Sequence, residues 1–268
     1  RTTELIEYLL ENGTDGLVIA GTTGESPTLT PEEKIQLFEH VVQTVDGRVP
    51  VIAGTGSNNT QETIEFTKAA EAVGVDGTLL VTPYYNKPNQ LGLLRHFETI
   101  AQNTQLPIML YNIPSRSVVK MDTDTVVQLA EIDNIVSIKD STGDLDGVAA
   151  IIEATDDNFS VYSGDDSLTL PLLSIGSKGV VSVASHIIGN DMKKMVDLFN
   201  AGSIEEAAAL HRKIIPLVKA LFMAPSPAPV KAALGRNNLQ VGSVRLPLVP
   251  LTNEEQALLH HALNSYSK

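Results

Sequence analysis

Seven short apolar runs, rich in β-branched residues, recur along the chain and separate segments of helical pattern. The runs are Gly16–Ala20, Pro50–Ala53, Gly77–Thr82, Pro107–Tyr111, Ile135–Lys139, Phe159–Ser163 and Gly179–Val183. Each run is nearly continuous in apolar character, which is typical of strands buried on both faces of a parallel sheet. A helix is expected after Thr30, where Pro31 suits the first helical position. Strand starts recur at roughly the spacing of a βα unit, so the sequence predicts an α/β fold.

The number of strands favours a (β/α)8 TIM barrel, although the count is one short of eight. The chain opens with a helical segment, Thr2–Asn12, before any strand has appeared. Because each barrel helix follows its own strand, we expect the first strand to lie upstream of Arg1. The sheet should then not close from Leu17–Ile19 directly onto Val180–Val183. The alternative is a seven-stranded doubly wound sheet, which needs no further residues.

The strand pattern stops after about Asn190, and only helical segments follow. They are Asp191–Ala201, Ser203–Met223, Pro229–Leu234 and Asn253–Ser265. The proline-rich stretch Ala224–Pro229 is too short for a domain linker. We therefore predict a barrel over residues 1–201, lacking its N-terminal strand, and a C-terminal helical extension over residues 202–268.

Composition excludes several classes of function. The net charge of −13 disfavours nucleic acid and anionic membranes as partners. The chain has no cysteine, which excludes disulfides, a thiol nucleophile and a cysteine metal site. No apolar run reaches the ~20 residues of a membrane span, and no signal peptide is visible. We expect a cytoplasmic protein.

Polar and aromatic residues gather where five of the predicted strands end. The clusters are Gly21–Ser26, Pro83–Asn86, Tyr111–Arg116, Lys139–Thr142 and Ser163–Asp166. In barrel enzymes the reactive groups lie at the C-terminal ends of the strands. The repetition of such clusters at five strand ends indicates an active site there.

Lys139 has two interpretations at this point. It can be a lysine that extends from a strand end to solvent or pairs with Asp140. It can also be an amine whose pKa is lowered by desolvation, so that it attacks a ketone and forms an imine. Imine chemistry requires no metal, and the six histidines show no metal-ligand spacing, so we expect neither a metal nor a cofactor.

The other rim residues also have two interpretations. Tyr85 and Tyr111 can pack at strand ends or transfer protons through their hydroxyls. Thr22 and Thr23 can belong to a tight turn or bind a carboxylate with hydroxyl and backbone N–H groups. Arg116 can be a surface charge or a fork for a second carboxylate.

The sequence blocks at these positions resemble those of a known family. The blocks are Gly21–Ser26, Val51–Gly56, Val81–Asn86, Tyr111–Arg116, Ile138–Lys139, Ser163–Asp166 and Gly179–Val183. Over essentially its whole length, the chain resembles the pyruvate-dependent class I aldolases, a family that includes dihydrodipicolinate synthases and N-acetylneuraminate lyases. The resemblance favours the catalytic interpretation of Lys139. It implies a TIM barrel that condenses pyruvate with L-aspartate 4-semialdehyde in lysine and diaminopimelate biosynthesis.

The resemblance also implies roles for individual catalytic residues. Lys139 would form the Schiff base with pyruvate, and Tyr111 would be the general acid and base beside it. Thr22 and Tyr85 would complete a hydroxyl relay with Tyr111. Tyr85 would come from the neighbouring subunit of a homotetramer or homodimer.

Four further residues would bind substrate. Thr23 would hold the pyruvate carboxylate, Val181 would lie against pyruvate, and Gly164 would line the pocket. Arg116 would meet the carboxylate of L-aspartate 4-semialdehyde. Because sialic-acid lyases usually lack that arginine, Arg116 carries most of the substrate assignment.

One region departs from the lysine-inhibited members of the family. Those members carry two histidines at the positions of Pro31 and Lys34, while Asn58, Glu62 and Tyr84 still match the effector site. A cation at Lys34 would disfavour a cationic amino acid. The sequence therefore predicts weak or absent feedback inhibition by lysine.

Other functions remain as alternatives. One is another pyruvate-dependent aldolase, such as a sialic-acid lyase or a keto-deoxy-sugar-acid aldolase. A second is a non-catalytic barrel that binds a keto acid, against which the lysine, tyrosine and threonine set counts. A third is a phosphate-binding isomerase, which would need a glycine-rich loop after the last strands. Ser182–His186 contains no glycine there.

Overall fold

The computed structural model describes residues 1–266 and contains a seven-stranded sheet. Its strands are β1 (Leu17–Ile19), β2 (Val51–Gly54), β3 (Gly77–Val81), β4 (Ile108–Asn112), β5 (Ile135–Asp140), β6 (Ser160–Ser163) and β7 (Gly179–Val180). All neighbours pair in parallel, and the strand order equals the chain order. The predicted parallel α/β sheet is confirmed.

The chain divides into two compact units. The first, called here the sheet unit, comprises residues 16–19 and 31–181 and contains all seven strands. The second, called the helical unit, comprises residues 1–15, 20–30 and 182–268. The two compact units thus have other boundaries than the predicted segments 1–201 and 202–268. Residues 1–15 and 182–201 join the C-terminal helices because α1 and α9 contact each other, as do α9 and α10.

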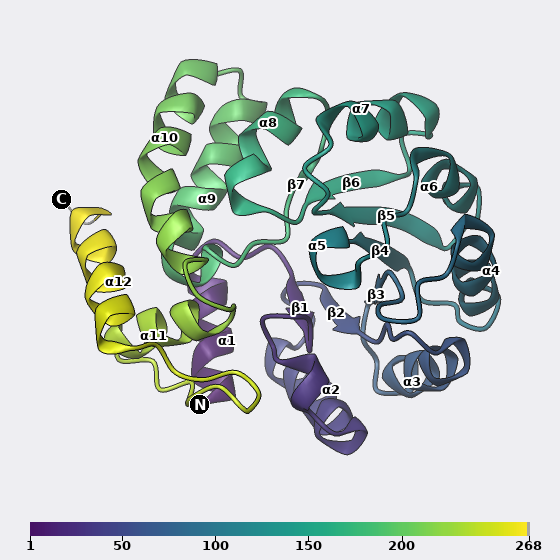
Figure 1. Ribbon diagram of the computed structural model, residues 1–268, viewed down its shortest axis with the longest axis horizontal. Coiled ribbons are helices and arrows are strands. Elements are labelled where there is room, and N and C mark those ends of the chain that lie inside the picture. The colour runs from purple at the N-terminus through teal and green to yellow at the C-terminus, as the bar shows by residue number, and fades with distance from the viewer. Residues whose placement is uncertain (267–268) are drawn as a thin grey trace. The chain divides into compact units, whose positions relative to one another are not determined.

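Helices of the sheet unit alternate with its strands. They are α2 (Pro31–Val45), α3 (Thr60–Ala72), α4 (Gln90–Ala101), α5 (Pro114–Ser117), α6 (Thr123–Ala130), α7 (Leu145–Ala154) and α8 (Thr169–Ser174), with a 3-10 turn, η2, at Asp166–Leu168. The α3, α4 and α7 starts are capped by Asn59, Asn89 and Asp144, whose side chains accept hydrogen bonds from first-turn N–H groups. Figure 1 shows α3, α4, α6 and α7 following one another along the outer side of the strands.

The two faces of the sheet bury different clusters. On the outer face, Leu80, Ile108 and Leu110 pack with helix residues such as Leu93 and Phe97, all fully buried. Each such side chain contributes roughly 1.5–3 kcal/mol through burial. The alternate residues of the same strands form a smaller cluster on the inner face: Leu79, Met109, Tyr111 and Ile113, packed against Val18, Ile52, Val81, Tyr162 and Val181. The period-2 alternation of strands produces this division.

A bulge decides which face Lys139 takes. Ile108 pairs with Ile135, but Met109 pairs with Ser137, so the register shifts by one residue between them. Ser137 and Lys139 therefore share the inner face with Met109 and Tyr111, whereas Ile135 belongs to the outer cluster. Simple period-2 alternation would place Ile135 on the same face as Ser137 and Lys139, but the bulge interrupts the alternation between Ile135 and Ser137.

The helical unit contains α1 (Thr2–Glu11), a 3-10 turn at Ser26–Thr28, α9 (Ser185–Asn200), α10 (Ile204–Leu221), α11 (Ala228–Arg236) and α12 (Asn253–Tyr266). The α9 helix begins before the predicted Asp191, and β7 ends before the predicted Val183. The reason is local, since Ser182 Oγ accepts a hydrogen bond from Ser185 N at 2.8 Å and supports the helix start. The apolar residues Val181 and Val183 did not reveal this hydrogen bond.

The two end strands of the sheet, β1 and β7, agree with the expectation that the sheet does not close directly between them. Among residues 1–266, no pairing joins β1 to β7, which stand at the two ends of the strand order. Direct closure from Leu17–Ile19 onto the last strand is thus absent from the described part of the chain. Within the same residues, no helix is long and apolar enough to cross a membrane.

Candidate active site

The centre of the candidate site is a row of paired residues across β4, β5 and β6. Tyr111 pairs with Lys139, and Lys139 pairs with Tyr162. Paired residues on neighbouring strands point to the same face of the sheet, which here is the inner face. The Lys139 Nζ lies 4.2 Å from the centre of the Tyr111 ring. The predicted nucleophile and its predicted proton-transfer partner are therefore in contact.

Burial changes the acidity of Lys139. Desolvation lowers its pKa from 10.5 to about 8, because the charged ammonium is disfavoured away from water. The Asp166 carboxylate opposes this shift, and the Arg116 guanidinium adds to it. An amine with a pKa near 8 is neutral in a useful fraction at neutral pH. Lys139 is thus suited to attack a ketone and form an imine.

Gly164 lies directly beside the side chain of Lys139. A methyl group at this position would stand 3.0 Å from both Cγ and Cε of Lys139 and would overlap Ser141 Oγ. The Gly164 N–H donates to the Asp140 carbonyl at 2.7 Å, which holds the backbone close to β5. The position requires glycine because the lysine stem occupies the space that a side chain would take.

Val181 continues the chain just after β7. Its N–H donates to the Ser163 carbonyl at 2.8 Å, and its side chain packs against the inner-face cluster that contains Tyr111. The structure therefore brings Val181 to the same face as Lys139, as predicted from the sequence. It places an apolar surface there.

Arg116 lies on the short helix α5, which follows β4. Its side chain is exposed, and its charge is close enough to lower the pKa of Lys139. Val118 follows with φ +67° and is itself exposed. A β-branched residue rarely adopts this left-handed conformation. The segment that carries Arg116 thus makes a tight and strained turn at the strand end.

Tyr85 protrudes from the sheet unit. Its side chain is 87% exposed and its φ is +73°, a left-handed conformation that is unfavourable for tyrosine. Tyr84 beside it is 41% exposed, and partial burial together with the Glu62 charge raises its pKa. The structure leaves the Tyr85 ring directed away from its own core.

Thr22 and Thr23 lie on the loop after β1, which belongs to the helical unit. The loop turns tightly, since Glu25 N donates to the Thr22 carbonyl at 3.1 Å. Glu25 anchors the loop: its carboxylate accepts from Lys231 Nζ at 2.7 Å and from Arg245 N at 2.8 Å. The roles predicted for the two threonines stay predictions.

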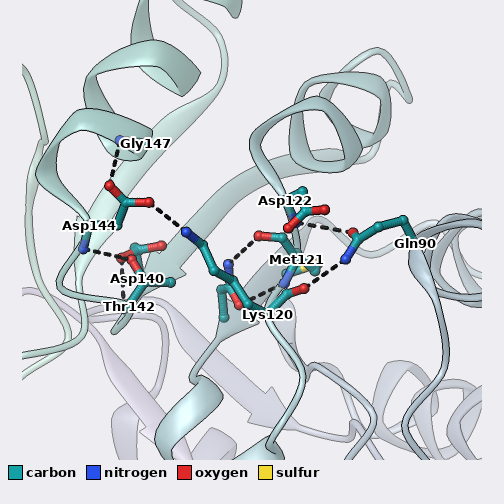
Figure 2. A network of polar contacts seen from close by, with 9 residues as sticks. Gln90, Lys120, Met121, Asp122, Asp140, Thr142, Asp144 and Gly147 are labelled. Atoms are coloured by element: carbon teal, nitrogen blue, oxygen red, sulfur yellow. Dashed lines mark hydrogen bonds and ion pairs between the residues drawn. The ribbon is translucent and has the colours of Figure 1, made fainter.

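Sequence reasoning assigned no role in the site to Asp140 or Tyr162, which lie next to Lys139 in the structure. Asp140, directly after the lysine, is a buried carboxylate whose Oδ1 accepts hydrogen bonds from Thr142 N and Thr142 Oγ1. Desolvation raises the Asp140 pKa. The carboxylate belongs to a network of polar contacts that extends to α4 and α7 (Figure 2). The Asp-x-Thr-x-Asp pattern after Lys139 was a visible signal of such local hydrogen bonding.

Tyr162 was also missed. It lies within a run that reads as a buried strand, and only the register with Lys139 shows its position on the inner face. Register is set by the partner strand, so no local signal could have indicated it.

Lys34 places a half-buried cation in the predicted effector region. Its Nζ lies 5.3 Å from the centre of the Phe66 ring, and burial lowers its pKa. Asn58 Nδ2 donates to the Tyr84 carbonyl at 3.0 Å, so these two predicted effector residues are adjacent. Among residues 1–266, no group of three or more histidine and acidic side chains is arranged to hold a metal ion.

A desolvated lysine in contact with a tyrosine, at the C-terminal ends of parallel strands, defines the class of α/β enzymes that can form a Schiff base with a carbonyl substrate. The comparison with known proteins makes the class specific. Residues 1–266 match the model of the dihydrodipicolinate synthetase family. The chain belongs to this family.

Named relatives of the chain agree with this family assignment. The chain is 63% identical over 263 residues to 4-hydroxy-tetrahydrodipicolinate synthase 1 of Halalkalibacterium halodurans, covering 98% of this chain and 89% of the relative. It is 58% identical over 261 residues to 4-hydroxy-tetrahydrodipicolinate synthase of Bacillus subtilis, covering 97% and 90%.

Solved structures show the same relationship. A crystal structure of dihydrodipicolinate synthase from Bacillus anthracis matches with a TM-score of 0.97 and 58% identity, covering 98% of this chain and 90% of that one. The enzyme from Cyanidioschyzon merolae, solved with lysine bound, matches with a TM-score of 0.98 and 47% identity, covering 99% and 91%.

Proposed function

We propose that this chain is a 4-hydroxy-tetrahydrodipicolinate synthase, a lyase of the class I aldolase type. It condenses pyruvate with L-aspartate 4-semialdehyde in lysine and diaminopimelate biosynthesis. The observation that carries the proposal is the desolvated Lys139 against the Tyr111 ring. The names of relatives that match nearly the whole chain support the particular reaction. Neither observation favours the sialic-acid lyase, sugar-acid aldolase or sensor alternatives.

In the proposed mechanism, the neutral Lys139 amine attacks the C2 carbonyl of pyruvate, and the resulting carbinolamine loses water to give an imine. The protonated imine withdraws electrons, so the pyruvate methyl group loses a proton and becomes an enamine carbon. That carbon attacks the aldehyde of the second substrate. The amino group of the adduct then attacks the imine carbon, which closes the ring and releases Lys139.

Proton transfers accompany each of these steps. Tyr111 is the proposed general acid and base, and its contact with the Lys139 ammonium supports that role. Thr22 and Tyr85 are proposed to extend the relay. The exposure and the left-handed backbone of Tyr85 support a contribution to the site of a neighbouring subunit.

The proposed binding residues divide between the two substrates. Thr23, Val181 and Gly164 would hold pyruvate, and the tight packing of Gly164 beside the Lys139 stem supports its place in the pocket. Arg116 would bind the carboxylate of L-aspartate 4-semialdehyde as a bidentate fork. Its charge at the strand-end rim, close enough to influence Lys139, supports that assignment.

The finer architecture is proposed with the function. We infer a complete (β/α)8 barrel, in which an eighth strand would lie between β1 and β7, with a C-terminal helical extension. The two strands at the ends of the present sheet support this inference. A homotetramer or homodimer in the cytoplasm, acting on the two substrates without a cofactor, completes the proposal.

Borohydride trapping tests the central claim. Reduction in the presence of pyruvate, followed by peptide mass spectrometry, should locate a pyruvate-derived adduct on Lys139. Lys139→Arg should abolish the adduct, because a guanidinium stays protonated and cannot attack a ketone. An adduct on Lys120 or Lys178, or none in an active sample, would refute the mechanism.

A further inference from the structure

The segment that carries Arg116 joins β4 to α6, and its C-terminal end is firmly attached. Asn112 and Met121 bond reciprocally: Asn112 Nδ2 donates to the Met121 carbonyl at 2.9 Å, and Met121 N donates to Asn112 Oδ1 at 3.1 Å. On the α4 side, Gln90 Nε2 donates to the Lys120 carbonyl at 2.9 Å (Figure 2). These bonds fix the backbone at residues 120–122, several residues beyond the guanidinium.

On the α7 side, the Lys120 side chain attaches the segment through an ion pair with Asp144. Lys120 Nζ donates to Asp144 Oδ2 at 2.5 Å, and Figure 2 shows the two side chains directed toward each other. The other oxygen of Asp144 accepts from Gly147 N at 2.9 Å and caps α7. Lys120 therefore ties the Arg116 segment to the first turn of α7.

The same network reaches the residue after the nucleophile. Asp144 N donates to Thr142 Oγ1 at 3.1 Å, and Thr142 Oγ1 donates to Asp140 Oδ1 at 2.7 Å. Asp140 is 3% exposed and directly follows Lys139. A continuous series of polar contacts thus runs from the lysine-bearing strand, through Thr142 and Asp144, to the segment of Arg116.

Between these attachments the segment is held at Ser117, which is 1% exposed and whose hydroxyl contacts the Ile113 and Val119 carbonyl oxygens, whereas the residues on either side of Ser117 are exposed. Arg116 is exposed, and Val118 is 63% exposed in a strained left-handed conformation. The Lys120 and Asp144 side chains are 41% and 39% exposed, so their ion pair adds little to global stability. Its effect should be local, on the position of the segment.

We propose that Lys120 and Asp144 are positioning residues that fix Arg116 at the distance from Lys139 required by the second substrate. The inference rests on the proposed function, in which Arg116 binds the carboxylate of the aldehyde. Pyruvate binding and imine formation take place at Lys139 and do not require the Arg116 segment. The ion pair should therefore affect the KM of the aldehyde and leave that of pyruvate unchanged.

The test measures steady-state kinetics for both substrates in Lys120→Met, Asp144→Asn and the double variant. Asparagine retains an oxygen that can cap α7, so Asp144→Asn removes the charge and keeps the cap. An exposed ion pair of this kind corresponds to a change of about two- to fivefold in KM. We expect that increase for L-aspartate 4-semialdehyde, with the pyruvate KM unchanged. The pyruvate trapping rate should also be unchanged when it is measured well above the Lys139 pKa, where the Arg116 charge no longer affects the neutral fraction of the lysine. The double variant should change no more than either single variant.

Two matched variants complete the design. Lys120→Arg keeps the cation and should restore the aldehyde KM to near the wild-type value. Lys193→Met removes an ion pair with Asp15 whose lysine is equally exposed, at 41%, in the helical unit. It should change neither KM.

The outcomes separate this inference from the proposed function. If Arg116→Ala raises the aldehyde KM but Lys120→Met and Asp144→Asn do not, the positioning role is refuted and the proposed function stands. Equal increases for both substrates would also refute it, because they indicate a general structural defect. If Arg116→Ala itself leaves the aldehyde KM unchanged, the substrate role of Arg116 fails and the positioning role fails with it.

Discussion

The lowered pKa of Lys139 leads to a quantitative prediction about imine formation. With a pKa of about 8, roughly 10% of the lysine is neutral at pH 7, whereas a lysine at 10.5 would be about 0.03% neutral. Desolvation therefore increases the reactive fraction by roughly 300-fold. The rate of pyruvate trapping by borohydride should rise with pH and level off above a midpoint near pH 8.

Two charges near the lysine allow the midpoint to be shifted in opposite directions. The Arg116 cation lowers the Lys139 pKa, so Arg116→Gln should move the midpoint to higher pH. The Asp166 carboxylate raises that pKa, so Asp166→Asn should move it to lower pH. Because the trapping assay contains pyruvate alone, loss of aldehyde binding in Arg116→Gln does not disturb the measurement.

The same shift has a consequence for stability. The folded-state pKa of Lys139 lies below the unfolded value, so burial of the ammonium destabilises the fold fully below pH 8. The penalty fades as the pH rises from 8 to 10.5. Lys139→Met should therefore stabilise the fold at pH 7 by up to roughly 3 kcal/mol, an upper value since part of the side chain meets solvent.

Two results of the trapping assay would refute the reasoning about the Lys139 pKa. One is a trapping midpoint near pH 10.5, and the other is a midpoint shift in the same direction for Arg116→Gln and Asp166→Asn.

Three further predictions concern the relay and the effector region. Tyr111→Phe keeps the ring against Lys139 but removes the hydroxyl, so kcat should fall by roughly 10²-fold or more in steady-state assays. Mixing inactive Tyr85→Phe and Lys139→Ala chains should restore partial activity if Tyr85 serves a neighbouring subunit; a demonstrated mixed oligomer without activity would contradict this. Inhibition by L-lysine should be weak or absent, because Lys34 places a cation over Phe66 and Pro31 supplies no imidazole. Half-inhibition at micromolar to low millimolar lysine would show the prediction to be wrong.

Much of the sheet could be predicted because short stretches of neighbouring residues indicate its strands and the start of α2. Continuous β-branched runs indicated all seven strands, and Thr30 with Pro31 marked the start of α2. The C-terminal limit of β7 was missed because Val181 and Val183 continue the apolar pattern of the strand, while the hydroxyl of Ser182 between them accepts a hydrogen bond from Ser185 N at the start of the next helix. Apolar character alone does not distinguish a strand from the residues that follow it.

The chemistry of the site was predictable to a smaller extent. The position of Lys139 at a strand end indicated a rim residue, but its face depended on the bulge opposite Ile108, which no local pattern reveals. The contact between Lys139 and Tyr111 follows from the register between β4 and β5. The ion pair between Lys120 and Asp144 depends on the position of the first turn of α7. Such relations join residues far apart in sequence, so they require the fold.

Gly164 gives the most direct test of how tightly the nucleophile is held. An added methyl group would lie 3.0 Å from Cγ and Cε of Lys139, closer than most real contacts of this kind, and would overlap the Ser141 hydroxyl. Since the Gly164 N–H is bonded to β5 at 2.7 Å, the backbone cannot easily withdraw, and the lysine stem must move instead. A displacement of about 1 Å at a reacting group can lower a rate by 10²-fold. Gly164→Ala should therefore slow pyruvate trapping by roughly ten- to a hundredfold, while the midpoint of its pH profile stays near 8 if the amine remains buried.

Gly235→Ala is the matched control, because a methyl group there meets nothing within 4 Å and alanine suits the interior of α11. If Gly164→Ala traps pyruvate at the wild-type rate, the lysine has room to adjust, and the tight packing inferred around its stem does not govern imine formation.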